Sequence, residues 1–362
     1  MENLIKRYEY LHAHPELSKQ EINTCAYLME QLQQMGYAPV RAGKYGVYAD
    51  LCKDPALPWI LLRSDMDALP VMEETEVAYA SQNPGVMHAC GHDSHMAMLL
   101  AAAEELKDKD VPQNIRFLFQ PAEEGVTGAA EMVDAGAVPA NTVAVFGMHV
   151  WPGIPQGKVL AKVGPLMASA TTLQIRCRGL SAHCGKRELG KDALMTMAEI
   201  LVRSKEAEAL AGGDGSILFF GKLQAGTSHN IVVSEAVMDG TLRTYYPETR
   251  EKVLAKLSEI AEQTAAAYGT EVEVLQKSYA PAVINPEELT KRVQELLPDA
   301  LTEIEPTRIA EDFSRYQAVA PGVLMWLGVG DTPSLHNSKF LPPRDVLPVG
   351  IATWIKLAEH KW

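Results

Sequence analysis

The chain of 362 residues has few cysteines, no strongly basic segment and no long hydrophobic run. Its five cysteines are odd in number and scattered, which fits reduced thiols in the cytosol better than a disulfide framework. The formal net charge of −13 argues against nucleic acid and anionic membrane surfaces as partners. The N-terminus lacks an apolar signal core, and the run MAMLLAAA is far shorter than the about 18 residues that a membrane span needs. We therefore expect a cytoplasmic protein that contacts neither nucleic acid nor membrane.

Apolar segments typical of strands alternate with helical patterns in the first part of the chain and again near its end. That alternation predicts an α/β domain with a mixed, mostly parallel sheet. Between these parts the pattern changes to strand, helix, two strands, helix and strand, which is the βαββαβ order of a ferredoxin-like unit. The sequence therefore predicts one domain formed by residues 1–168 and 282–362, interrupted by an inserted domain of residues 169–281.

Candidate metal ligands follow the predicted strands of the first domain. The segment MHACGHDSH (87–95) holds a cysteine and three histidines, FQPAEEG places two glutamates after a strand, and two more histidines follow later strands. Because the carboxyl ends of strands in an open α/β sheet face a common crevice, we expect these side chains to meet at one edge. The candidate ligands are Cys90, His92, Glu124, His149 and His336.

Five candidate ligands exceed the roughly four of a single structural zinc and fit two metal ions that share a bridging group and a water. Glu123 is then left over beside the ligands and suits a general base. Thiolate and imidazole favour zinc, cobalt or nickel, whereas carboxylates also admit manganese. Taken alone, each segment has an ordinary interpretation as a buried thiol, a hydrogen-bonded core histidine or a solvated helix start. Their shared position at strand ends favours the metal centre.

Seven motifs, taken together, resemble the metal-dependent aminoacylase and amidohydrolase family, which includes hippurate hydrolases, plant auxin-conjugate hydrolases and N-acetyl-diaminopimelate deacetylase. The motifs are RSDMDALP, MHACGHDSHMA, FQPAEEG, MHVWP, GTLRT, EDF and LHN, within a match that runs from about residue 8 to the C-terminus. The resemblance implies a dinuclear catalytic domain interrupted by a smaller lid domain. It also implies roles for single residues: Cys90 as the bridge between the metals, His92, Glu124, His149 and His336 as terminal ligands, Glu123 as the base, and Asp67 and Asp93 as supports behind the ligands.

The inserted segment GLSAHCGKRELGKDAL is similar to the lid motif of that family. The resemblance implies that His183 reaches a metal site, in many members that of a partner subunit, and that Asn230 and Arg243 contact the substrate. It therefore also implies a homodimer or a higher homo-oligomer through the lid. The run from Cys184 to Arg187 departs from the family, which has small residues and a proline there, and Glu188 replaces a frequent histidine. The two cations of this run could change the substrate class, and a solvated loop is the alternative.

The combined interpretation is hydrolysis of the amide bond of an N-acyl amino acid to a carboxylic acid and a free amino acid. Two divalent metal ions activate a bridging water, and Glu123 acts first as general base and then as general acid. A dipeptidase or carboxypeptidase of the same superfamily is the alternative within this chemistry. A non-catalytic metal-binding protein would have no use for the spare carboxylate of Glu123. No Gly-x-Gly-x-x-Gly motif follows a strand, which argues against a nicotinamide- or flavin-linked enzyme.

Overall fold

Buried apolar strands and helices alternate along most of the chain, and the computed structural model, which describes residues 2–362, folds them into two compact units. The large unit comprises residues 2–166, Ile284–Glu305 and Glu311–Trp362, and the small unit comprises Met167–Val283 and Pro306–Ala310. The large unit holds a mixed sheet and the small unit an antiparallel one, so the predicted α/β fold class is confirmed. Within the described residues, no helix is long and apolar enough to cross a membrane.

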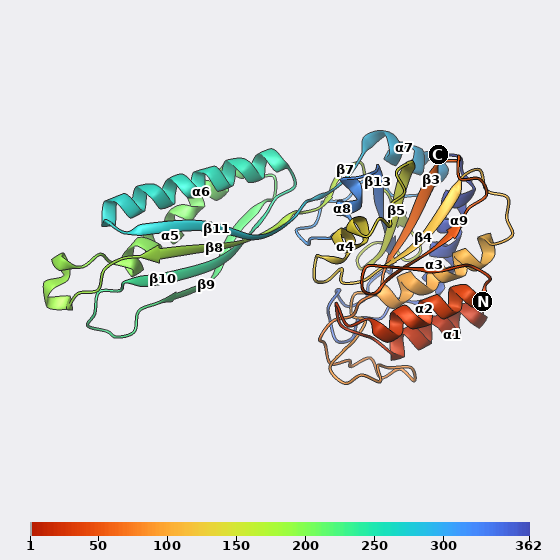
Figure 1. The fold of residues 1–362 in the computed structure, drawn as a ribbon, viewed down its shortest axis with the longest axis horizontal. Helices are drawn as coiled ribbons and strands as arrows, with labels where there is room; N and C mark the ends of the chain where they lie inside the picture. Colours follow the sequence, from red (N-terminus) through yellow and green to blue (C-terminus); the bar gives the residue numbers. More distant parts are fainter. Residues whose placement is uncertain (1) are drawn as a thin grey trace. The chain divides into compact units, whose positions relative to one another are not determined.

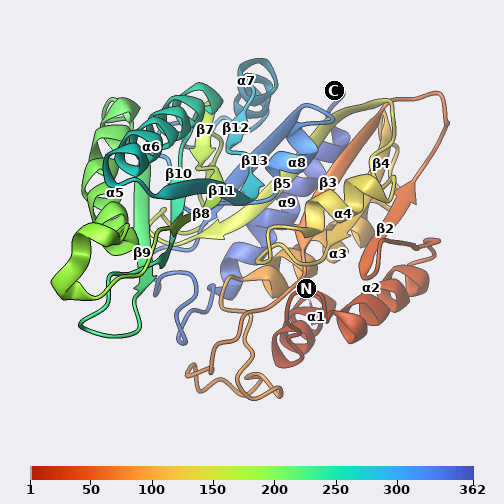
Figure 2. The same cartoon turned by 60° about the vertical axis from the view of Figure 1, so that its left-hand side comes forward.

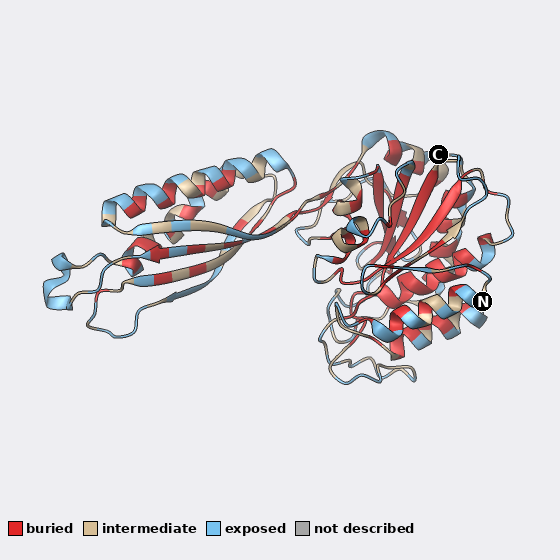
Figure 3. Cartoon of the chain, viewed as in Figure 1, coloured by how far each residue is buried: buried red, intermediate tan, exposed pale blue. Residues whose placement is uncertain are grey.

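The sheet of the large unit has seven strands in the order β1-β2-β4-β3-β5-β13-β6. Its four central strands, β4, β3, β5 and β13, are parallel; β2 and β6 pair antiparallel to them, and β1 pairs antiparallel to β2. Every residue of β3, β4 and β13 is buried, as expected for parallel strands that are covered on both faces (Figure 3). The bounds are β1 (Val40–Ala42), β2 (Gly46–Leu51), β3 (Trp59–Asp65), β4 (Asn114–Gln120), β5 (Thr142–Trp151), β6 (Val159–Leu160) and β13 (Gly322–Gly328).

Helices cover both faces of this sheet (Figure 1). Helix α3 packs against α9 and α1 on one face, and α4 and α8 lie on the other. The sequence of α3 is apolar almost all round, which explains why it is buried between the sheet and the outer helices. The helix bounds are α1 (Glu2–Ala13), α2 (Ile22–Gln34), α3 (His92–Leu106), α4 (Gly128–Asp134), α7 (Glu287–Leu296), α8 (Ser314–Gln317) and α9 (Leu347–Glu359). A separate two-stranded sheet consists of β7 (Gly164–Met167) and β12 (Val283–Asn285), and a short 3₁₀ turn, η3 (Arg344–Val346), precedes α9.

The small unit follows the predicted βαββαβ order, with a sheet in the order β11-β8-β10-β9. Helices α5 and α6 pack side by side on one face of that sheet (Figure 2), and their apolar residues form a separate core with β8 and β10. The bounds are β8 (Ala170–Arg178), η1 (Cys184–Leu189), α5 (Ala193–Glu208), η2 (Ala209–Ala211), β9 (Ile217–Ala225), β10 (Glu235–Arg243), α6 (Pro247–Tyr268) and β11 (Glu271–Ala280).

One strand of the small unit is shorter than its sequence pattern predicts. The apolar pattern predicts a strand from Asn230, but β10 begins only at Glu235. The backbone before it pairs instead with the loop that follows β8: Cys184 N–H donates to Asn230 O, and Val232 N–H donates to Ala182 O. Asn230 therefore lies in a loop that is tied to the loop carrying His183.

Candidate metal centre

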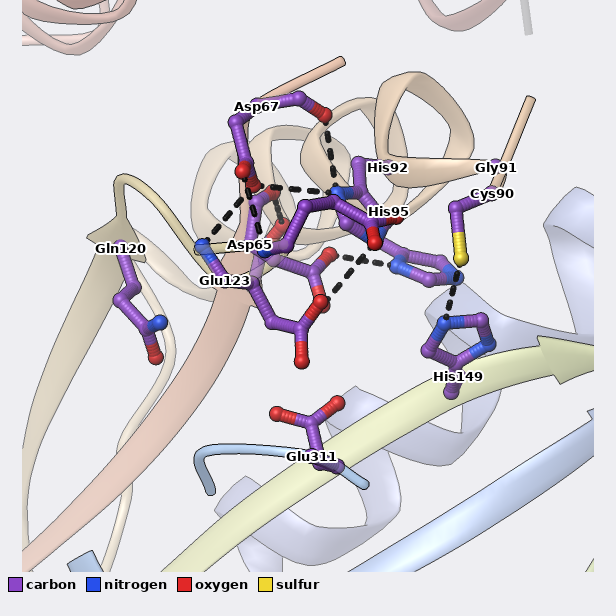
Figure 4. Close-up of polar contacts among 12 residues, drawn as sticks. Asp65, Asp67, Cys90, Gly91, His92, His95, Gln120, Glu123, His149 and Glu311 are labelled. Atoms are coloured by element: carbon purple, nitrogen blue, oxygen red, sulfur yellow. Dashed lines mark hydrogen bonds and ion pairs between the residues drawn. The ribbon is translucent and has the colours of Figure 1, made fainter. Parts of the chain in front are cut away.

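Side chains from separate segments converge at the carboxyl-terminal edge of the parallel strands (Figure 4). Strand β3 and the residues after it, the start of α3, the loop after β4, strand β5 and the loop after β13 all contribute. In that order the residues are Asp65 and Asp67, Cys90 and His92, Glu123 and Glu124, His149, and His336. The structure thus brings the five ligands predicted from the sequence to one edge of the sheet.

These ligands form two overlapping groups. One atom each of Cys90, Glu124 and His336 lies within 4.8 Å of the other two. On the opposite side, Cys90 Sγ lies 3.4 Å from His149 Nε2, and His92 lies within 4.8 Å of the carboxylates of both neighbouring glutamates. Cys90 and Glu124 therefore belong to both sides of the site. Both lie near His336, and on the other side Cys90 lies near His149 and Glu124 near His92. The two sides are called the His336 side and the His92 side, each a candidate metal position.

Gly91 allows the start of α3 to approach β5 closely. Its φ of +85° lies in the left-handed region, and a Cβ atom there would lie 2.5 Å from Cγ2 of Val150. A larger residue would be both strained and in collision, which is why glycine occupies this position. Cys90 and His92, on either side of it, are thereby held against the end of β5 that carries His149.

The rings of His92 and His149 are oriented by backbone carbonyl groups. His92 Nδ1–H donates to Asp67 O at 2.9 Å, and His149 Nδ1–H donates to Val150 O at 2.7 Å. Because a carbonyl only accepts, Nδ1 of each ring carries a proton, and the lone pair of the neutral ring is on Nε2. His92 Nε2 is buried and has no hydrogen-bond partner among the described residues. Such a ring, fixed through one nitrogen and open at the other, is typical of a metal-ligating histidine.

Electrostatics around these ligands favour a cation. Burial opposes protonation of His92, but the carboxylates of Asp65 and Asp67 outweigh it and raise its pKa to about 10. Burial and the neighbouring His95 lower the pKa of His149, so its ring is neutral. Burial and the carboxylate of Glu124 raise the pKa of the Cys90 thiol well above its usual value. A thiolate at this position therefore needs a compensating positive charge.

His95 lies among the same side chains but is not available as a ligand. Its Nδ1–H donates to Asp65 Oδ1 at 2.6 Å, and its Nε2 accepts the N–H of Val150 at 2.9 Å. Both ring nitrogens are engaged, although the ring stands 4.6 Å from that of His149. Of the two histidines in CGHDSH that face the centre, only His92 has a ring nitrogen, Nε2, without a hydrogen-bond partner among the described residues.

Asp67 holds the loop that carries the two glutamates. Its carboxylate accepts the backbone N–H groups of Glu123 and Glu124, each at 3.1 Å, and the hydroxyl of Ser18 at 2.6 Å. Ala122, just before them, has a φ of +50°, a strained conformation for a non-glycine residue. Glu21 Oε1 also accepts the N–H of Ala122 at 2.8 Å, so the backbone of this loop is bonded to two carboxylates.

A fully buried arginine lies beneath the centre. Arg63 donates to Asp65 at 2.7 Å, to Glu311 at 2.9 Å and to Asp312 at 3.2 Å, and Gln120 accepts its Nε–H. These acidic partners are also buried, and Arg63 compensates only part of their charge. The centre has six carboxylates against one guanidinium: Asp65, Asp67, Glu123, Glu124, Glu311 and Asp312 against Arg63.

Glu123 lies beside two of these buried acids, Glu311 and Asp312. It is 6% exposed, and an oxygen of its carboxylate lies within 4.8 Å of oxygens of Glu311 and Asp312 (Figure 4). Burial, and then the charge of Glu311, raise the pKa of Glu123 well above its usual value. Burial likewise raises the pKa of Asp312 to about 8, although Arg63 opposes this. A carboxylate in such surroundings holds a proton more tightly than a solvated one, and a pKa raised towards the working pH suits a general base.

The residues present fit two divalent cations. The donor set combines one thiolate, imidazole lone pairs and carboxylate oxygens, and the surrounding acids supply more negative charge than Arg63 neutralises. Besides His92 Nε2, the Oε1 atom of Glu124 is buried without a hydrogen bond from any described residue, and His336 Nε2 lies 3.3 Å from it. Buried atoms of this kind are rare in folded proteins unless an ion or water completes them.

The predicted lid residues lie in the small unit, at opposite ends of its sheet. His183 and Asn230 belong to the two loops that are bonded together at the end where β8 finishes and β10 begins. Arg243 is the last residue of β10 and lies at the end where the chain enters the unit, because the next residue, Thr244, is bonded to Ser169. With nine residues in β10, the two ends are about 27 Å apart.

The loop at His183 is exposed throughout. His183 Nδ1 accepts the N–H of Gly185 at 3.1 Å, which leaves the ring proton on Nε2 when the ring is neutral. Cys184, Lys186 and Arg187 follow in a short 3₁₀ turn with no buried residue. In the single chain, the unusual run that replaces the family's small residues is therefore an exposed turn beside His183.

Sequence reasoning missed several residues of the centre. Gln120, Glu311 and Asp312 were not assigned a role, although EDF was among the motifs of the resemblance. Two signals were present: an arginine directly after the apolar run WILL, and two adjacent acids before a phenylalanine. A charge within a buried strand needs a partner, but nothing in the sequence near Arg63 indicates which distant acids supply it.

Comparison with known proteins assigns the chain to a family. The family model described as Peptidase family M20/M25/M40 matches residues 61–360. The chain belongs to this family. The resemblance inferred from the motifs is thereby confirmed, and the M20 chain is a hydrolase.

Relatives of this M20 chain span almost its full length. An N-acetylcysteine deacetylase of Bacillus subtilis (strain 168) is 34% identical over 98% of the chain and 96% of its own length. An N-acetyldiaminopimelate deacetylase of Streptococcus pneumoniae (strain Taiwan19F-14) is 32% identical over 100% of the chain and 99% of its own length. The crystal structure of a dinuclear metal-binding M20 peptidase from Bacillus subtilis has a TM-score of 0.87 at 32% identity, covering 98% of this chain and 96% of that one.

Proposed function

We propose that the chain is a metal-dependent amidohydrolase that cleaves the amide bond of N-acyl amino acids, releasing a carboxylic acid and a free amino acid. The observation that carries the proposal is the buried carboxylate of Glu123, which lies within 4.8 Å of ligand atoms of His92 and Glu124 and of the buried acids Glu311 and Asp312, but outside the set of five ligands that the motifs imply. The names of the relatives, both deacetylases of N-acetyl amino acids, support the same bond type.

Two divalent metal ions, held by Cys90, His92, Glu124, His149 and His336, would supply the positive charge that lowers the pKa of a water and polarises the substrate carbonyl. Glu123 takes the proton of the attacking water and passes it to the amine nitrogen as the amide bond breaks. Asp67 keeps Glu123 in place by accepting its backbone N–H, and the buried acids beside Glu123 favour the protonated carboxyl that forms. The metals are zinc, manganese, cobalt or nickel.

The proposal is tested with chelated protein to which zinc, manganese, cobalt or nickel is restored separately. The substrates are N-acetyl-diaminopimelate, N-acetyl-methionine, N-acetyl-cysteine, hippurate and a few dipeptides, and released amine is measured. We expect metal-restored turnover of at least one N-acyl amino acid. Turnover of dipeptides alone would favour a dipeptidase, and two bound metals per chain with no turnover on any substrate would favour a non-catalytic metal protein.

We further propose that the chain acts as a homodimer and that His183 of one subunit serves the centre of the other. In support, His183 and Asn230 lie beyond the end of β10 that is opposite to Arg243, and this strand alone is about 27 Å long, so one small substrate cannot contact both ends of a single lid. In a dimer, Arg243 would come from one lid and the other two residues from that of its partner.

We place this enzyme in the cytoplasm, because all five cysteines are free.

Mixing two inactive variants tests the shared site. Glu123→Gln lacks the base and His183→Ala lacks the lid residue, so each homodimer should be inactive. After unfolding and refolding together, about a quarter of wild-type activity should return, because half of the dimers are mixed and each mixed dimer has one complete site. The double variant Glu123→Gln/His183→Ala, refolded with either single variant, is the control and should stay inactive. No recovery in the mixture would place His183 in the site of its own subunit or outside any site.

A further inference from the structure

The last turn of α1 carries a buried histidine that no step above uses. His12 is 1% exposed. Its Nδ1 lies 2.6 Å from Asp93 Oδ2 and its Nε2 lies 3.0 Å from Glu73 Oε1. Carboxylates accept, so both ring nitrogens carry hydrogen and the ring is a cation between two anions. Burial opposes this charge, but the two hydrogen bonds outweigh it and raise the pKa of His12 to about 9.

The bond on the Nδ1 side leads directly to a predicted ligand. Asp93 is fully buried and follows His92 in the first turn of α3. Its second oxygen accepts the N–H of Ser94 at 2.8 Å, so the carboxylate spans from His12 to the backbone of this turn. The Nε2 atom of His92 can reach the centre only if this turn keeps its place against β5.

The bond on the Nε2 side leads away from the centre. Glu73 belongs to the loop between β3 and α3, where it also accepts the hydroxyl of Thr75 and, at 2.6 Å, the N–H of Ser81. In the same loop, the ring of Tyr79 meets the edge of the His12 ring at 5.3 Å between centroids. The two bonds of His12 therefore have different targets: one fixes the ligand turn, and the other fixes an outer loop.

We propose that His12 is a positioning residue for metal binding, which acts through its Nδ1–H bond to Asp93 to hold the turn that presents His92. The effect is confined to the metal position that uses His92, whereas the position on the His336 side does not depend on it. This inference rests on the proposed dinuclear centre.

Two substitutions separate the two bonds. In His12→Asn the amide nitrogen takes the place of Nδ1, and in His12→Gln it takes the place of Nε2. Both remove the charge, but only His12→Asn keeps the bond to Asp93. The readouts are the affinities of the two metal positions, measured by competition with a chelator, and the visible absorption spectrum of the cobalt-loaded chain.

We expect His12→Gln to weaken one of the two positions by about 10–100-fold, as is usual when an outer support of a ligand is lost, and to alter the cobalt spectrum. His12→Asn should stay within a few-fold of wild type. The matched controls are His14→Asn and His14→Gln, because His14 lies two residues away in the same sequence and its Nδ1 only bonds the carbonyl of Tyr10.

Equal losses in His12→Asn and His12→Gln, or no loss in either, would overturn the proposal. If His12→Gln does not fold, Asp93→Asn and Glu73→Gln test the same two bonds from the other side. Asp93→Asn should then lower the metal affinity of one position, whereas Glu73→Gln should lower the affinity of neither. Glu74→Gln, one residue away from Glu73, is the control. A wild-type chain that binds two metals but hydrolyses no N-acyl amino acid contradicts the proposed function alone, and these affinities still decide the role of His12. A wild-type chain without two metal positions contradicts both.

Discussion

Glu123→Gln is expected to lower kcat by about 10²–10⁴-fold while the chain keeps two metal ions. The amide has the size of the carboxylate and keeps the backbone bond to Asp67, so the loop should not move. It cannot accept the proton of the attacking water, which burial and Glu311 otherwise favour by raising the pKa of Glu123. Metal content by elemental analysis and turnover of the best N-acyl amino acid measure the two halves of the prediction.

Glu124→Gln is the matched comparison, because it makes the same change one residue away. Its carboxylate belongs to both ligand groups, so this variant should lose metal as well as turnover. Undiminished activity in Glu123→Gln, or a loss of metal as large as in Glu124→Gln, would contradict the assignment of Glu123 as base. The pair therefore distinguishes proton transfer from metal binding at two adjacent carboxylates.

The second large effect is expected for Cys90→Ala, which should lose metal from both positions and with it all measurable turnover. Cys90 Sγ lies near His149 on one side and in one ligand group with Glu124 and His336 on the other. Loss of a bridging thiolate should exceed the about 10–100-fold cost of losing an outer support. Metal affinity is measured by the same chelator competition, and folding by circular dichroism.

Cys25→Ala controls for the removal of a buried thiol. Cys25 is fully buried in α2, in the apolar core and outside the ligand groups, so its loss should affect the free energy of unfolding but not metal content. If Cys90→Ala kept two metals, the thiolate would have to be replaced as bridge by another group. That result would remove the explanation given for the cysteine in MHACGHDSH.

The fold and the set of candidate ligands follow from patterns that are local in sequence. Each predicted strand is a short apolar run, and the parallel arrangement of β4, β3, β5 and β13 puts the side chains after them at one edge. No pattern, however, distinguishes His92 from His95 as a ligand. That distinction depends on Asp65 and on the N–H of Val150, which occupy the nitrogens of His95 from other strands.

Residues joined by long-range contacts could not be predicted. Arg63 and Glu311 are 248 positions apart, and only the folded sheet brings the guanidinium to that carboxylate. His12 and Asp93 are 81 positions apart, and neither has a motif that points to the other. The start of β10 differs from the sequence pattern for a related reason. The apolar run after Asn230 has a strand pattern, but β10 begins only at Glu235, because the backbone partners of this run are in the loop after β8.

The two groups of candidate ligands differ in their access to solvent. His92 and His149 are buried, whereas the side chain of His336 is 49% exposed and its backbone has a φ of +66°. A cation on the His336 side would thus exchange with the medium more readily than its neighbour, which the sheet and α3 enclose. The centre would then pass through a half-loaded form whenever free metal is scarce, and mixed pairs of ions could assemble from the supply at hand.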